Sequence, residues 1–239
     1  MSEKLLTDEY KAEIRANFAR VRDALSKIGR DDVTLLAATK TLSAEVINFA
    51  IDELELRYIG ENRVQELVSK YELLHKDGVH IHFIGRLQKN KVKYIADKVE
   101  MIHSLDSLSL AVEINKQCLK IGKVMDVLVE VNIGSEESKG GIPKEQVHDF
   151  VKALSEFKNI RVCGLMVIPP RGSDDDYRKY FTESREIFVD IFGNKDHNKD
   201  EKYLLSMGMS DSYIHAAQCG SDIVRMGSAL FGERDYQNK

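Results

Sequence analysis

Short apolar segments alternate along this chain with longer segments in which apolar residues recur every three or four positions. A short apolar run bounded by charged or turn-forming residues is typical of a buried β-strand, whereas the longer spacing is typical of an amphipathic helix. The clearest run is VTLLAATK, in which five of the first six residues are apolar. The pattern predicts strands at Val33–Lys40, Arg57–Gly60, His80–Gly85, Glu100–His103, Met125–Ile133, Val162–Ile168, Tyr203–Ser206 and Ile223–Met226.

An additional helix is predicted before the first strand. Thr7 can cap its N-terminus, and Asp8 and Glu9 in its first turn complement the helix dipole. Gly29 is expected to end it. One face of this helix is apolar and consists of Tyr10, Ile14, Phe18, Val21, Leu25 and Ile28.

The segments between the strands predict further helices. Ser43 is in position to cap the first of them, and Asn62 can cap the second, with Gln65 placed as in a capping box. Pro143 is expected in the first turn of another helix, where its missing N–H costs nothing. The remaining helices are predicted at Lys91–Asp97, Ser107–Ile121, Tyr177–Ile191 and Asp211–Cys219.

Strands that alternate with helices predict a parallel sheet built from right-handed βαβ units. The chain has 239 residues, which is close to the roughly 250 of an eight-stranded α/β barrel. An open doubly wound sheet is less favoured, because no dinucleotide-binding glycine motif follows the first strand. The predicted fold class is therefore α/β: a single (β/α)8 TIM-type barrel domain over residues 1–239, with an extra N-terminal helix.

Composition narrows the possible functions. The net charge is −4, so there is no basic surplus for nucleic acid or an anionic membrane, and no apolar segment approaches membrane-spanning length. Cys118, Cys163 and Cys219 are odd in number and form no C-x-x-C pair, which favours buried free thiols in a reducing compartment. The charged N-terminus lacks the apolar region of a secretory signal. We therefore expect a cytoplasmic protein.

Lys40 is the most informative polar residue, because it ends the first strand and ligands bind at the carboxyl ends of parallel strands. A lysine there could also simply emerge into solvent. The loops Ser206–Ser210 and Arg225–Ser228 combine glycine with serine hydroxyls at the two places where barrels commonly bind phosphate. A desolvated lysine opposite a phosphate site suggests a phosphorylated aldehyde held as an imine. Pyridoxal 5'-phosphate (PLP) is the commonest ligand that meets both demands.

Other polar residues have simpler alternatives. Asn62 is either a helix N-cap or a side chain that points into the barrel mouth. His82 lies within an alternating strand, where a histidine is more often a core residue than a catalyst. Lys139 follows the fifth strand and offers a second amine near the mouth. Core packing explains the methionines near strand ends, which are Met166, Met207, Met209 and Met226.

Seven segments, in order along nearly the whole chain, resemble the pyridoxal phosphate homeostasis protein family. The resemblance implies a monomeric barrel similar to the N-terminal domain of alanine racemase, which binds PLP through a lysine imine. The segments are Leu35–Lys40 (LLAATK), Ile59–Glu66 (IGENRVQE), His82–Lys91 (HFIGRLQKNK), Val131–Gly141 (VNIGSEESKGG), Gly164–Val167 (GLMV), Ser206–Asp211 (SMGMSD) and Val224–Gly232 (VRMGSALFG).

The resemblance also implies roles for individual residues. Lys40 is the expected imine lysine, Asn62 lies beside the cofactor, and Arg225 faces the pyridine nitrogen. The expected phosphate-binding residues are Ser210, Gly227 and Ser228. Two positions depart from the family pattern: Leu42 replaces a common second lysine, and Asp222 replaces a small hydroxyl residue, which is expected to weaken the anion site slightly.

These features predict a cytosolic protein that carries or buffers PLP, with no robust catalytic turnover and with apo PLP enzymes as possible recipients. One alternative is a PLP-dependent amino-acid racemase on the same barrel, which would need a further domain and a second base from a partner. Another alternative is a barrel isomerase acting on a sugar phosphate, with Lys40 as an electrostatic group. No metal site is expected.

Overall fold

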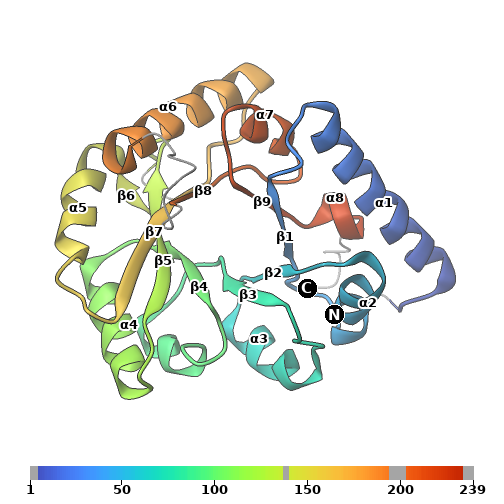
Figure 1. The fold of residues 1–239 in the computed structure, drawn as a ribbon, viewed down its shortest axis with the longest axis horizontal. Helices are drawn as coiled ribbons and strands as arrows, with labels where there is room; N and C mark the ends of the chain where they lie inside the picture. Colours follow the sequence, from blue (N-terminus) through green and yellow to red (C-terminus); the bar gives the residue numbers. More distant parts are fainter. Residues whose placement is uncertain (1–4, 137–139, 194–202, 234–239) are drawn as a thin grey trace.

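The structure of this chain is a computed structural model that describes residues 5–136, 140–193 and 203–233. Lys139 lies outside these ranges. Eight parallel strands close into a barrel, because β4 pairs with both β3 and β5. The strands lie in the centre of Figure 1 and the helices surround them. The eight barrel strands are β1 (Thr34–Ala38), β2 (Tyr58–Glu61), β3 (His80–Phe83), β4 (Met101–Leu105), β5 (Met125–Asn132), β7 (Ile160–Val167), β8 (Leu204–Ser206) and β9 (Ile223–Met226). A short ninth strand, β6 (Ile142–Pro143), pairs with β5 outside this ring.

The predicted (β/α)8 barrel and its extra N-terminal helix are confirmed. Side-chain caps form at two of the expected places, Thr7 and Ser43, and also at Ser107: each accepts a hydrogen bond from the backbone N–H three residues later. The helices are α1 (Asp8–Lys27), α2 (Ala44–Leu54), α3 (Val64–Lys70), α4 (Leu108–Lys120), α5 (Val147–Leu154), α6 (Asp174–Phe192), α7 (Tyr213–Gln218) and α8 (Ser228–Phe231), with 3₁₀ turns at Tyr71–Leu73, Lys89–Tyr94 and Lys144–Gln146.

Three local predictions are wrong. Asn62 does not cap a helix: α3 starts one residue later, Arg63 is its N-cap, and no side-chain cap bond or capping box with Gln65 forms. The helix expected at Lys91–Asp97 is a 3₁₀ helix that begins at Lys89. Pro143 lies in the short strand β6 beside β5, because its φ of −52° and ψ of 137° are extended rather than helical.

The main core lies between the barrel and its helices. The predicted apolar face of α1 packs there, and of its six residues only Ile28 is partly exposed. Inside the barrel lie two smaller apolar layers: Leu36 packs with Ile84 and Ile223, and Met101 packs with Leu128 and Met166. These layers pack the interior of the barrel, and the loops at its mouth remain available for a ligand.

The N-terminal helix packs on the outside of the barrel against α8, the helix that follows the last strand. The Tyr10 hydroxyl donates to the Phe231 carbonyl at 3.0 Å, and the Asn17 amide donates to the Leu230 carbonyl at 3.2 Å. Both acceptors belong to α8, which follows the last strand. The helix α1 therefore supports the connection that carries Gly227 and Ser228.

The cysteines and several absences also bear on function. All three cysteines are free thiols, but only Cys118 is buried, so the expectation of three buried thiols is wrong for Cys163 and Cys219. Among the described residues, no cluster of histidine, cysteine, aspartate and glutamate could hold a metal ion. No helix in this described part is long and apolar enough to cross a bilayer.

Candidate functional site

A cavity of about 510 Å³ opens at the carboxyl ends of β1, β2, β8 and β9. We call it the Lys40 cavity. The structure brings all of the predicted site residues to its wall, namely Lys40, Asn62, Ser210, Arg225, Gly227 and Ser228. These residues meet because β1 lies between β2 and β9, so the first two and the last two loops of the barrel are neighbours. The cavity therefore combines an amine, an amide, a guanidinium and two glycine–serine loops.

The backbone around Lys40 is held by a buried ion pair. The Lys70 Nζ lies 2.7 Å from Glu61 Oε1 and donates to the Thr39 carbonyl at 2.9 Å and the Leu42 carbonyl at 3.4 Å. The Thr39 hydroxyl donates to the same Glu61 carboxylate. Glu61 is fully buried, and burial raises the pKa of its carboxyl, although the Lys70 charge opposes this. The pair thus fixes the residues on both sides of Lys40.

A second carboxylate holds the turn that follows Lys40. Thr41 has a φ of 65°, which is unusual for a β-branched residue, and its N–H donates to Glu66 Oε2 at 2.8 Å. Arg63 lies 3.0 Å from the other oxygen of Glu66. These contacts therefore hold Thr41 in its strained backbone conformation, and such strain is common in loops that are positioned for function.

The serine–glycine loops pack against each other as the sequence suggested. Ser210 Oγ accepts from the N–H of Gly227 at 3.3 Å and of Ala229 at 3.2 Å, which leaves its own proton free to point elsewhere. Gly208 has a φ of 92°, and a Cβ there would lie 2.5 Å from the Ala216 Cβ. A glycine is required at this position for the loop after β8 to reach the loop after β9.

Arg225 is buried beneath the cavity and its guanidinium is fixed. It donates to the Ser206 carbonyl, the Ser206 hydroxyl and the Val167 carbonyl, each at 2.8 Å. Burial lowers the pKa of Arg225 to about 10, while the charge of Glu130 opposes the shift. The guanidinium therefore remains charged at neutral pH, and it can only donate hydrogen bonds.

Two histidines continue this network through the barrel interior. His103 Nδ1 lies 3.2 Å from the Ser206 hydroxyl, and His103 Nε2 lies 2.9 Å from His82 Nδ1. Burial lowers the pKa of His82 to about 4 and the pKa of His103 well below its usual value. Both rings are therefore neutral at pH 7. The interpretation of His82 as a core histidine is confirmed, and it acts with His103 as packing behind Arg225.

Glu130 adds a carboxyl group to the mouth. Burial and the neighbouring charge of Asp106 raise the pKa of Glu130 to about 7, although Arg225 and Arg86 oppose the shift. Its side chain lies on β5, two residues beyond Leu128 of the interior layer. Sequence reasoning missed Glu130, because a single acidic residue near a strand end carries no motif.

Tyr177 was also missed as a site residue. It was predicted only as part of an apolar helix face, yet it lines the Lys40 cavity from α6 while its ring stacks on Phe181 at 6.1 Å. Asn62 Oδ1 is buried and has no hydrogen-bond partner within the described structure. A phenol and an unsatisfied amide oxygen at one cavity are suited to a ligand with polar substituents on a ring.

One predicted departure has a different role from the one expected. Asp222 does not lie at the anion site: it precedes β9 at its amino end, where its carboxylate accepts from the Leu205 N–H at 2.8 Å. The glycine–serine loops lie at the opposite, carboxyl end of that strand. Met166, Met207 and Met226 are fully buried, as core packing requires, but Met209 is 36% exposed at the cavity.

Known proteins share both the sequence and this architecture. Residues 11–235 match the family described as alanine racemase, N-terminal domain. The pyridoxal phosphate homeostasis protein of Aquifex aeolicus is 44% identical over 220 residues, which cover 91% of this chain and 95% of that protein. The protein of the same name from Escherichia coli strain K12 is 37% identical over 236 residues, which cover 95% of this chain and 99% of that protein.

A solved relative extends the match to three dimensions. The structure of PipY from Synechococcus elongatus PCC7942, with PLP bound, superposes with a TM-score of 0.78 at 27% identity and covers 92% of this chain and 100% of PipY. The family match, the alignment over nearly the full length of the relatives and the shared barrel all indicate the same family. The chain therefore belongs to the alanine racemase N-terminal domain family and, within it, to the pyridoxal phosphate homeostasis proteins.

Proposed function

We propose that this protein binds PLP in the Lys40 cavity, as an imine of Lys40, and that it stores and delivers the cofactor in PLP homeostasis. The observation that carries the proposal is the convergence of an amine, two glycine–serine loops and a fixed guanidinium on one cavity of about 510 Å³. Relatives that match nearly the whole chain are named for PLP homeostasis, and PipY has been solved with PLP bound.

The residues present fit the cofactor. The Ser210 hydroxyl, whose own proton is not used in these bonds, and the Ser228 hydroxyl are donors for a phosphate, and Lys40 is the amine for an aldehyde. The unpartnered Asn62 Oδ1 can accept from a ring hydroxyl. Arg225 can donate to a ring nitrogen that carries no proton. Each functional group of PLP thus has a partner of the right type on the cavity wall.

Replacing Ser210 with alanine is expected to weaken PLP binding about tenfold or more, because a donor to a charged group contributes on the order of 1.5–3 kcal/mol. The change also removes the contacts with the N–H groups of Gly227 and Ala229. Absorbance titrations with PLP and with pyridoxal, which lacks the phosphate, measure the effect. Ser155→Ala is the control, since Ser155 is exposed at the end of α5. Equal affinity of the wild type for the two vitamers would contradict the placement of the phosphate.

We further propose that the protein does not turn over amino acids efficiently. When bound, PLP supplies an electron sink for the α-carbon of an amino acid, and an acidic partner at the ring nitrogen strengthens that sink. Arg225 cannot fill the role of an acidic partner, because it stays charged and its donors are fixed by Ser206 and Val167. The chain's own residues therefore favour holding the cofactor over activating a substrate.

A racemase is the second candidate, because Tyr177 gives the cavity a phenol that could transfer a proton. We expect no more than trace exchange of the α-proton when alanine or serine is incubated with PLP-loaded protein in deuterium oxide. Mass spectrometry of the amino acid measures it. Multiple turnovers at rates approaching the roughly 1–10³ per second of ordinary enzymes, lost in Tyr177→Phe, would replace the carrier proposal with an enzyme.

The last part of the proposal concerns the oligomeric state of the protein, its location and the enzymes that receive PLP. We propose that the protein acts as a monomer in the cytoplasm and passes PLP to apo PLP enzymes. The family relationship and the absence of a membrane-spanning helix among the described residues support this setting. Light scattering measures the mass in solution, and activation of an apo PLP enzyme by the loaded protein, compared with free PLP at equal concentration, measures delivery.

A further inference from the structure

A second and larger cavity, of about 950 Å³, lies beside the Lys40 cavity. We call it the Lys89 cavity. Its wall comes from the connections that follow β2, β3 and β4, so it opens at the same carboxyl end of the barrel. Asn62 lines both cavities, and the two therefore share a wall. Its volume lies within the range of small-molecule sites in proteins.

The charge of this cavity is strongly one-sided. Its lining contains four cations, Arg63, Arg86, Lys89 and Lys91, and a single carboxylate, Asp106. Within the described residues, Arg86, Lys89 and Lys91 have no carboxylate within 4 Å. A protein of net charge −4 has no general surplus of cations to place there. Cations that outnumber the carboxylates on one concave surface raise the local concentration of anions.

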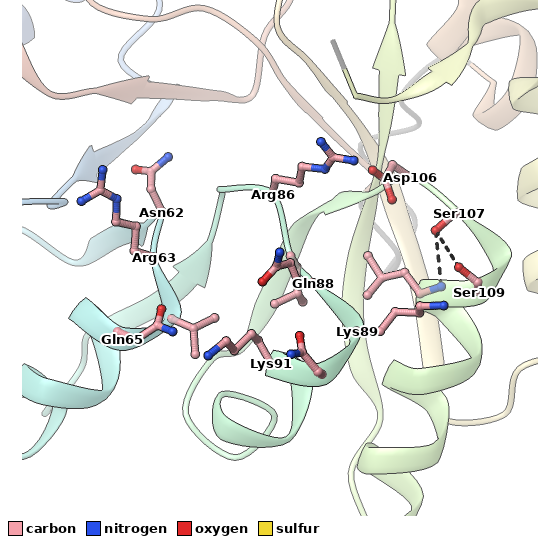
Figure 2. Close-up of a pocket in the computed structure, with 14 residues that line it drawn as sticks. Asn62, Arg63, Gln65, Arg86, Gln88, Lys89, Lys91, Asp106, Ser107 and Ser109 are labelled. Atoms are coloured by element: carbon pink, nitrogen blue, oxygen red, sulfur yellow. Dashed lines mark hydrogen bonds between the residues drawn. The ribbon is translucent and has the colours of Figure 1, made fainter. Parts of the chain in front are cut away.

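The arrangement of the side chains indicates the size and kind of anion. In Figure 2 the segment Arg86–Lys91 lies between the side chains of Asn62–Gln65 on one side and those of Asp106–Ser109 on the other, and Lys91 extends toward Gln65. Three buried apolar side chains also contribute to the wall, namely Val64, Leu87 and Leu110. Cations beside an apolar wall suit a small organic molecule that carries a phosphate.

We propose that the Lys89 cavity is a second binding site, for a phosphate monoester of a small organic molecule, adjacent to but distinct from the Lys40 cavity. Lys89 and Lys91 provide its main charge contacts, and the amides and serine hydroxyls of the wall provide neutral hydrogen bonds. The inference rests on the proposed function, since the expected ligand is a vitamer of the same class as PLP. A molecule bound there is separated from the Lys40 cavity by the wall that contains Asn62.

The test first fills the Lys40 cavity permanently. PLP-loaded, ¹⁵N-labelled protein is reduced with borohydride, which converts the imine C=N bond into a stable C–N bond. The reduced protein is then titrated with pyridoxine 5'-phosphate, which has no aldehyde, and separately with inorganic phosphate. We expect saturable changes in the amide signals of residues 86–91 and 107–110. Tighter binding of the organic phosphate than of inorganic phosphate is expected, because only the former contacts the apolar wall.

Two double variants, each lacking two positive charges, show whether binding depends on the lysines of the Lys89 cavity or only on the overall charge. Lys89→Gln/Lys91→Gln is expected to weaken binding at least about fivefold, because two charge-assisted contacts are lost. Lys93→Gln/Lys116→Gln removes the same charge from exposed residues outside the cavity and is expected to bind like the wild type. Absence of saturable changes at residues 86–91, or an equal loss in both double variants, would overturn the proposal.

Failure of the proposed function is distinguishable in the same experiment. If Lys40 forms no imine, borohydride treatment adds no cofactor mass to the peptide that contains Lys40. The titration of the unreacted protein then still tests the Lys89 cavity, because signals of residues 210 and 227–229 report the Lys40 cavity separately from those of residues 86–91. Changes confined to the first group contradict the second site, and saturable changes in the second group support it.

Discussion

Lys40→Ala is expected to abolish the yellow absorbance that PLP gives with the wild-type protein. Lys40 follows the first barrel strand and lines the cavity together with the two glycine–serine loops and Asn62. The imine needs an amine at that place, and alanine has none. Spectra recorded before and after the addition of one equivalent of PLP measure the change. Borohydride reduction and peptide mapping of the wild type should locate the cofactor on the peptide that contains Lys40.

The control for this experiment removes an exposed lysine that lies outside both cavities. Lys93→Ala should leave the spectrum unchanged, because Lys93 is exposed on the 3₁₀ turn after β3. Lys139 is the first alternative attachment site to inspect in Lys40→Ala, since it is the other amine predicted near the mouth. Cofactor found mainly at another lysine in the wild type would contradict the assignment of Lys40 as the imine lysine.

Lys70→Met is expected to be the most destabilising single change at the site. Lys70 is the only positive charge within 4 Å of the fully buried Glu61 in the described residues, and it also binds two carbonyls of the Lys40 loop. Removing one partner of a buried pair leaves an uncompensated charge, and such changes cost about 3–5 kcal/mol. Urea unfolding of the two proteins measures the difference in the free energy of unfolding. The loop should also hold Lys40 less well, so the affinity for PLP should fall.

Two further variants separate the buried pair from a general effect of losing a lysine. Lys27→Met breaks an exposed ion pair with Asp23 and should change the stability far less. Lys70→Met/Glu61→Met removes both charges and should recover much of the loss, because a buried pair can often be replaced by apolar side chains. If Lys70→Met unfolds at the same urea concentration as Lys27→Met, the buried pair does not stabilise the loop.

The barrel could be predicted from sequence because its signal is repeated. Each strand is a short apolar run, and two of the predicted helix caps, Thr7 and Ser43, formed as expected. The errors lie where local and tertiary preferences compete. Asn62 has the side chain of a good N-cap, but the structure places it on the wall between two cavities and starts α3 after Arg63.

The predicted site residues also meet in one cavity, and their roles toward PLP remain predictions. The buried residues that hold these side chains in place could not be predicted from the sequence. Glu61 and Lys70 lie nine residues apart on different elements, and only the fold brings their charges to 2.7 Å. His103 and Ser206 are 103 residues apart, yet both help to hold Arg225. Pairings between distant segments leave no spacing pattern in a single sequence.

The pairing of β1 with β9 has a consequence for the order of folding. Lys40 follows β1, whereas Gly227 and Ser228 follow β9, so the two halves of the Lys40 cavity come together only when these strands join. The contacts of α1 with α8 form at the same seam. A nascent chain therefore gains its ligand site only in the step that closes the ring. Any ligand that spans the seam binds only the closed state, so it should raise the free energy of unfolding as its concentration rises above its dissociation constant.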